Sequence, residues 1–219
     1  MTNHHRIVLE QGSKKVFATF IDWPGWSRSG RSDQDAIDVL VSYADRYQII
    51  AGNAGVPGVK AAADDPDVIE TLKGSGATDF GVPDKVARAD HEFMTDAECE
   101  RQIKLLESCW AYFDEVSQKV SPEMQKGPRG GGRDRDEIIS HTLEADRGYA
   151  RQIGVRTSPG HIEREGGIAA HREDVVKAIR TQNREEVETK WPLRYFIRRA
   201  AWHMLDHAWE MEDKDLRDK

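Results

Sequence analysis

The sequence predicts an α+β chain in which a small α+β domain precedes an all-α, up-and-down four-helix bundle. Two observations predict this fold class. Before residue 75, short runs rich in β-branched and aromatic residues alternate with turns that contain Gly and Pro. From Thr95 onward, apolar residues recur at helical spacing in four successive segments. We therefore expect an α+β domain at 1–75, a linker at 76–93 and a helical domain at 94–219.

The N-terminal elements follow from local signals. Residues 5–10 and 16–21 are expected to form a strand hairpin around a turn at 11–15. A Trp-Pro-Gly-Trp turn then ends the second strand, and its tryptophans are expected to pack in the turn, with exposed aromatic contacts to a partner as the alternative. Ser32 is an N-cap for a helix that continues to about Tyr47. Residues 60–67 are expected to be a loop, and residues 68–72 a third strand.

The C-terminal helices have clear start and stop signals. Thr95 opens a capping box, and Pro122 ends the first helix. The second helix is expected from about Asp134 to Gly154, and a loop at 155–170 follows it. The third is expected at about 171–187, and the fourth opens at Trp191 and Pro192.

Composition and charge exclude several classes of protein. The 219 residues carry a net charge of −7, spread over both halves. This charge argues against nucleic acid as a partner, because such binding depends on neutralised phosphates. No apolar run approaches the ~18 residues of a membrane span, and the N-terminus has no secretory-type apolar segment. We expect a cytoplasmic protein with reduced cysteines, Cys109 being a small core residue.

Three histidines interrupt the apolar stripes of the predicted helices. His203 and His207 lie four residues apart, so both imidazoles can reach one ion from the same helix face. His141 lies on the inward stripe of the second C-terminal helix. Burying three imidazoles without an ion would leave polar groups unpaired, which is costly. We expect these three residues to bind a metal, whereas we expect solvent exposure and no role for the others (His4, His5, His91, His161, His171).

The charged residues near the three histidines could each have one of two roles. Glu144, Asp206 and Glu210 are expected either to orient an imidazole or to lie on the surface, rather than to bind the metal directly. Arg199 lies one turn before His203 and is either an anion contact above the metal or a surface residue of an arginine cluster.

The segments around His141 (residues 136–144) and around His203 and His207 (residues 199–207), in the four-helix order, resemble the DinB/YfiT-like superfamily over about residues 94–215. That superfamily includes thiol-dependent transferases and mycothiol-dependent maleylpyruvate isomerases. Its one-His-plus-HxxxH pattern binds a divalent metal with open coordination sites, and all three positions are matched here. Three histidine ligands suit Zn, Ni, Mn or Fe equally by ligand type. The resemblance implies a small-molecule substrate and a low-molecular-weight thiol. Metal-assisted hydrolysis remains an alternative reaction, and a homodimer is a possible assembly.

Residues 17–36, with their Pro-Gly turn and the helix that follows, resemble the HicB-like antitoxin fold over about residues 5–72. No added DNA-binding module is visible, so toxin neutralisation is not favoured. The evenly spread negative charge also argues against a sequence-specific DNA or RNA regulator. The resemblance implies a scaffold or a partner-binding module. The alternative function is therefore a non-catalytic interaction or stress-response protein.

Overall fold

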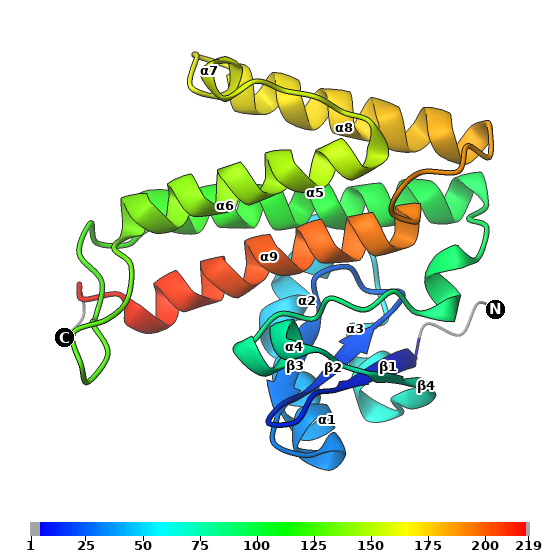
Figure 1. Cartoon of the computed structure of the whole chain (residues 1–219), viewed down its shortest axis with the longest axis horizontal. Helices are drawn as coiled ribbons and strands as arrows, with labels where there is room; N and C mark the ends of the chain where they lie inside the picture. Colours follow the sequence, from blue (N-terminus) through cyan, green and yellow to red (C-terminus); the bar gives the residue numbers. More distant parts are fainter. Residues whose placement is uncertain (1–4, 218–219) are drawn as a thin grey trace.

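The N-terminal part of the chain is a mixed four-stranded sheet in the order β3-β2-β1-β4 (Figure 1). In the computed structural model, which describes residues 5–217, the strands are β1 (Arg6–Gln11), β2 (Val16–Phe20), β3 (Ser27–Gly30) and β4 (Asp67–Lys73). β1 pairs antiparallel with β2, and parallel with β4. The predicted hairpin is confirmed, and the predicted third strand lies within β4. β3 was not predicted, because its polar residues have no strand-like pattern.

Three helices follow β3: α1 (Asp33–Ser42), α2 (Ala44–Asn53) and α3 (Val59–Asp64). Ser32 caps α1 through a bond from the backbone N–H of Asp35, as predicted. The loop prediction for 60–67 is wrong at its start, where α3 is helical. Its alanines favour a helix, and Ala62 and Ala63 are buried with Val59 against the core, which the polar flanks of the segment concealed.

The Pro24-Gly25 turn, which follows β2, packs against the last C-terminal helix. Gly25 has a φ of +91°, and a Cβ there would lie 2.7 Å from Cδ1 of Leu205. Glycine therefore permits both the left-handed backbone and its close approach to the last helix. Trp23 and Trp26 on either side are buried, so the prediction of turn packing is confirmed.

The C-terminal part contains α5 (Asp96–Lys119), α6 (Arg135–Ala150), α8 (Gly167–Arg184) and α9 (Leu193–Lys214). Thr95 caps α5, Asp134 caps α6, and Gly154 follows the short helix η2 (Arg151–Ile153) with a φ of +85°. α8 begins and ends a few residues before its predicted range. The expected loop at 155–170 contains a further short helix, α7 (Pro159–Ile162).

α6 and α8 run in the same direction, whereas a strict up-and-down order would make them antiparallel (Figure 1). After α6 the chain returns along the helices before α8 begins. Contacts agree with this course: Arg172 near the start of α8 pairs with Asp114 in the second half of α5, and Arg180 near its end pairs with Glu100 in the first turns of α5. α8 is thus antiparallel to α5. α9 packs against both α5 and α6.

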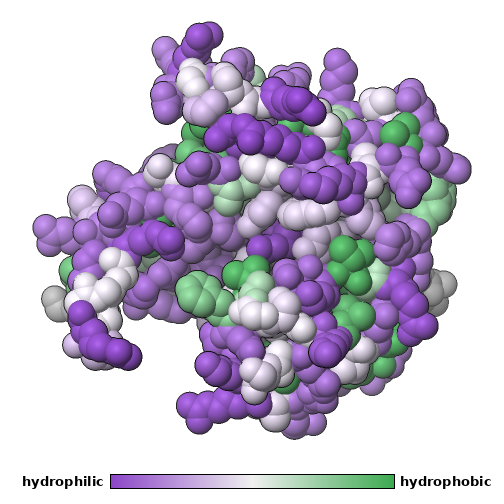
Figure 2. Space-filling view, viewed as in Figure 1, coloured by the Kyte–Doolittle hydropathy of each residue, from purple (hydrophilic) through white to green (hydrophobic). Residues whose placement is uncertain are grey.

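One hydrophobic core extends from the sheet into the C-terminal helices. The segment predicted as a linker contains α4 (Gly76–Phe80) and the short helix η1 (Arg88–His91). Within η1, Asp90 is buried and forms an ion pair with Arg198 of α9 at 2.6 Å. The segment is therefore packed between the sheet and α9. In the view of Figure 2 the outer surface is mostly hydrophilic, with hydrophobic residues in small separate patches.

Candidate metal centre

His141 of α6 converges with His203 and His207 of α9. One ligand atom from each lies within 4.8 Å of the others. The ring centroids are 5.1 Å apart for His141 and His203, 5.2 Å for His141 and His207, and 4.6 Å for His203 and His207. One helical turn places the last two on the same face of α9, and the packing of α6 on α9 brings the third to them. The three imidazoles that the sequence singled out are close enough to hold one metal ion.

The local sequence explains why these imidazoles face inward. α9 is buried over most of its length because it packs between the sheet and the other helices. On the same stripe as the histidines, Phe196, Ala200 and Met211 are fully buried, as is Ile138 one turn before His141. An amphipathic helix buries such a stripe, and the histidines are carried inward with it.

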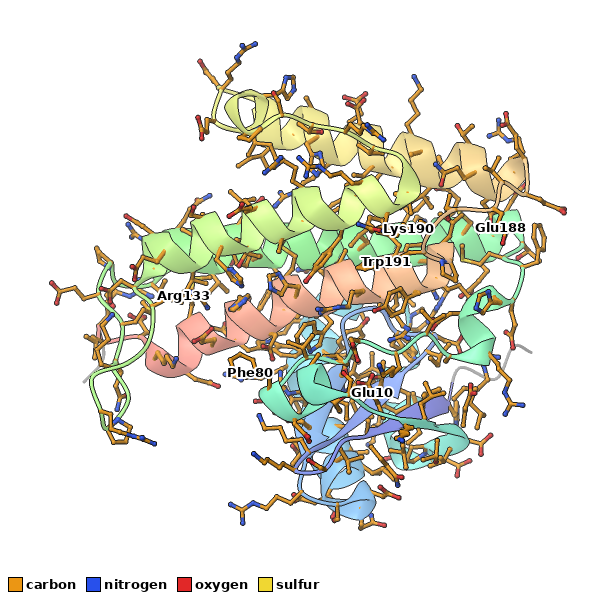
Figure 3. All side chains as sticks on the ribbon, viewed as in Figure 1. Glu10, Phe80, Arg133, Glu188, Lys190 and Trp191 are labelled. Carbon is orange, nitrogen blue, oxygen red and sulfur yellow. The ribbon has the colours of Figure 1, made fainter. Side chains whose placement is uncertain are left out.

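Burial sets the charge state of the site. His203 is 7% exposed, and desolvation lowers its pKa to about 2, with the nearby charges of His207 and Arg199 acting in the same direction. Desolvation also lowers the pKa of the half-buried His141, assisted by Arg133 and His207. Figure 3 labels Arg133 just before α6. Both imidazoles are therefore neutral at pH 7, the form in which histidine donates a lone pair to a metal.

Two features of the histidines, one unpartnered nitrogen and one hydrogen bond, fit a metal site. The Nδ1 atom of His203 is buried and has no hydrogen-bond partner among the described residues. His207 instead donates from Nδ1 to a carboxylate oxygen of Glu210 at 2.8 Å, which leaves its Nε2 available as a ligand. A carboxylate that orients a ligating imidazole in this way is the usual second contact of a metal-binding histidine.

The other carboxylates near the histidines have separate roles. Glu144 is exposed and Asp206 pairs with Arg28 at 3.1 Å. Glu210 is half-buried between His207 and Lys214, and its bond from His207 lowers its pKa to about 2. The expectation that these groups orient an imidazole or lie on the surface is confirmed for Glu210 and Glu144.

Arg199 is not a surface residue. Its side chain is 7% exposed and stacks on Tyr149 and Trp202, with its central carbon 5.0 Å and 4.4 Å from the two ring centroids. The surface interpretation is wrong because the arginine cluster lies on the inward side of α9, and not in solvent. Sequence alone gives little indication of this, since arginine is usually exposed.

His171 was expected to be solvated, but it is buried. Its Nδ1 lies 2.7 Å from the hydroxyl of Thr157, and its Nε2 lies 3.7 Å from a carboxylate oxygen of Asp146. It belongs to the apolar face of α8, and its position at the predicted start of that helix concealed this. Of the remaining histidines, His5 is half-buried, His91 and His161 are exposed, and His4 lies outside the described residues.

Both cysteines, Cys99 and Cys109, are free and buried in α5. Burial raises the pKa of Cys99 to about 11 and that of Cys109 further above its ordinary value. Cys109 is a small core residue, as predicted. Neither thiol has the lowered pKa of a reactive cysteine.

No protein-family model, curated protein or solved structure matches this chain. Within the described residues, no helix combines the length and apolar character that crossing a membrane requires.

Proposed function

We propose that this chain binds a divalent metal and acts as a thiol-type transferase or isomerase on a small molecule. The convergence of His141, His203 and His207 carries the proposal. The resemblance to the DinB/YfiT-like superfamily supports the reaction class, with α5, α6, α8 and α9 as the corresponding four-helix bundle. On this proposal the N-terminal unit is a HicB-like scaffold.

The three histidines would hold the ion, and each has a distinct supporting environment. Burial keeps His203 and His141 neutral, while Glu210 keeps the proton of His207 on Nδ1. A divalent ion bound here would act as a Lewis acid on an oxygen or sulfur of the substrate. Three protein ligands leave coordination positions open for that contact. Imidazole suits Zn, Ni, Mn and Fe, so all four are candidates.

A thiol reactant would come from outside the chain. Cys99 and Cys109 are the only cysteines of the sequence, and both are buried with raised pKa values. A buried thiol with a raised pKa is a poor nucleophile. A low-molecular-weight thiol therefore fits the proposal better than either side chain.

Metal content is the first test. Protein purified without a His tag should contain about one equivalent of metal, consistent with a single three-ligand site. A His203→Ala/His207→Ala variant should retain less than about a tenth of an equivalent, because one remaining imidazole cannot hold the ion. The control variant His91→Ala/His161→Ala removes two exposed histidines and should bind like the wild type. Equal metal content in both variants would refute the site.

Turnover is the second test. A panel of electrophilic small molecules should be converted only when a low-molecular-weight thiol is present, and His141→Ala should abolish the conversion. Conversion of esters or amides without thiol, still dependent on His141, would favour metal-assisted hydrolysis instead. Capture of a protein partner, with no turnover under either condition, would favour the interaction-protein alternative.

A further inference from the structure

Arg199 differs from the other buried arginines of α9 in having no acidic partner among the described residues. Arg194 lies 3.8 Å from Asp22 and 3.5 Å from Glu98, and Arg198 lies 2.6 Å from Asp90. All three arginines are at most 7% exposed. The Nη1 atom of Arg199 is buried, and no group within residues 5–217 hydrogen-bonds to it. A buried charge without a counter-charge is costly, so its retention calls for an explanation.

Two aromatic rings hold the Arg199 guanidinium beside the histidines. It stacks on Tyr149 of α6 and on Trp202 of α9. The same two rings contact His203, with centroid separations of 5.6 Å for Tyr149 and 5.9 Å for Trp202. Arg199, His203 and His207 are spaced by four residues along one helix face. The guanidinium is therefore fixed one turn away from the metal ligands.

Unpartnered donors gather at this point. The indole Nε1 of Trp202, like Nη1 of Arg199, is buried and has no hydrogen-bond partner in the part of the chain that the structure describes. Glu210, the acid that contacts His207, is also bound by Lys214, so both of its carboxylate oxygens are already engaged. Among the described residues, the site thus offers a fixed positive charge and unpartnered N–H groups, and no acidic side chain is paired with either.

We propose that Arg199 binds the carboxylate of an organic-acid substrate whose other end approaches the histidines. A planar guanidinium matches a carboxylate through two parallel hydrogen bonds, and stacking on rings fixes its orientation without neutralising it. The assignment of this acid as a substrate rests on the proposed metal-dependent function. The binding of a carboxylate by Arg199 does not, and it can be measured without metal.

Acetate and acetamide are the probes, because they share a shape but differ in charge. Each is titrated into the full chain at constant ionic strength, both metal-free and metal-loaded. The readout is the indole N–H resonance of Trp202, assigned with Trp202→Phe. Acetate should shift this resonance saturably in the metal-free protein, whereas acetamide should not.

Three variants distinguish a specific effect of Arg199 on acetate binding from the effect of losing one positive charge anywhere on the chain. Arg199→Met keeps the apolar stem between the two rings and should weaken acetate binding at least about tenfold, because a charge-assisted pair is lost. Arg199→Lys keeps the charge without the planar fork and should bind at an intermediate level. Arg180→Met removes an exposed, ion-paired arginine of α8 and should bind acetate like the wild type.

Folding of Arg199→Met is checked by thermal unfolding in acetate-free buffer. Its midpoint should equal or exceed that of the wild type, because an unpaired buried charge has been removed. If Arg199→Met unfolds at a lower temperature than the wild type, the Arg199→Lys variant is used for the test. Undiminished acetate binding by Arg199→Lys, which lacks the planar guanidinium, would overturn the proposal. Equal acetate binding by wild type and Arg199→Met would also overturn it, as would the absence of any acetate response in the wild type.

The two proposals fail separately. Loss of metal binding with intact acetate binding leaves Arg199 as an anion receptor and removes the metal-dependent function. If the protein holds stoichiometric metal but wild type and Arg199→Met bind acetate equally, the metal site stands and the role of Arg199 as a carboxylate receptor is refuted.

Discussion

Glu210 accepts a hydrogen bond of 2.8 Å from Nδ1 of His207, and its other oxygen is bound by the ammonium of Lys214 at 2.5 Å. All three residues lie on successive turns of α9. The relationship fixes both the proton and the ring orientation of one candidate metal ligand. It therefore predicts that the carboxylate affects metal affinity without binding the ion.

Glu210→Gln should weaken metal affinity about 10- to 100-fold and leave the stoichiometry near one, since a neutral amide orients the imidazole less strongly. Competition with a chromophoric chelator measures the affinity. Glu144→Gln is the matched control, because Glu144 lies one turn from His141 but is exposed. A metal-free Glu210→Gln protein would instead make Glu210 a direct ligand.

Asp90→Asn should destabilise the chain by about 3–5 kcal/mol, because it leaves the buried guanidinium of Arg198 without its ion-pair partner. The exposed pair of Arg180 and Glu100 provides the comparison. Glu100→Gln should cost less than about 1 kcal/mol. Urea unfolding of both variants measures the difference, and equal losses would contradict the packing of η1 against α9.

Gly25→Ala should cost more than Gly58→Ala, although both glycines have a left-handed backbone. At Gly58 the nearest atoms to an added Cβ are those of Trp23 at 3.7 Å, an ordinary contact, so strain of about 1–2 kcal/mol is the whole cost. At Gly25 the Cβ also collides with Leu205, which adds about 1–3 kcal/mol of overpacking. Thermal or denaturant unfolding tests the order, and similar losses would refute this close approach of the turn to α9.

Thr78→Val should destabilise the chain more at about pH 8 than at about pH 4. Burial raises the pKa of Glu10, while the hydroxyl of Thr78, which donates to Oε1 at 2.5 Å, lowers it. Figure 3 labels Glu10 on β1, beneath α9 in that view. A raised carboxyl pKa means that stability falls as pH rises through the folded value. Valine at position 78 should raise the pKa of Glu10 further. The loss of stability caused by the charged form of Glu10 is therefore complete above the pKa of Glu10 in the folded variant, and it shrinks below that pKa.

Thr78→Val also removes the α4 cap that accepts from the backbone N–H of Ser75, a cost independent of pH. Thr78→Ser keeps both bonds and should remain close to wild type at either pH. Urea unfolding at the two pH values is the measurement. A loss of equal size at both would show that Glu10 does not respond to Thr78.

Local patterns predicted much of the fold because helix caps and hairpins depend on near neighbours. Ser32, Thr95, Asp134 and Gly154 mark helix ends where expected. β3 and α3 were not predicted because both depend on contacts with residues outside their own segment. Ser27–Gly30 is a strand because β2 offers it a partner, and α3 is ordered by burial of small side chains against the core.

The sequence by itself determined the pair His203 and His207, since a four-residue spacing on any helix places two side chains on one face. It also indicated that His141 lies on an inward stripe. Only the tertiary structure brought His141 to within 5.2 Å of both, because the packing of α6 against α9 depends on contacts far apart in the chain. Likewise only the packing distinguished Arg198, which has a buried acid beside it, from its neighbour Arg199, which has aromatic rings beside it and no acidic partner in the described part of the chain.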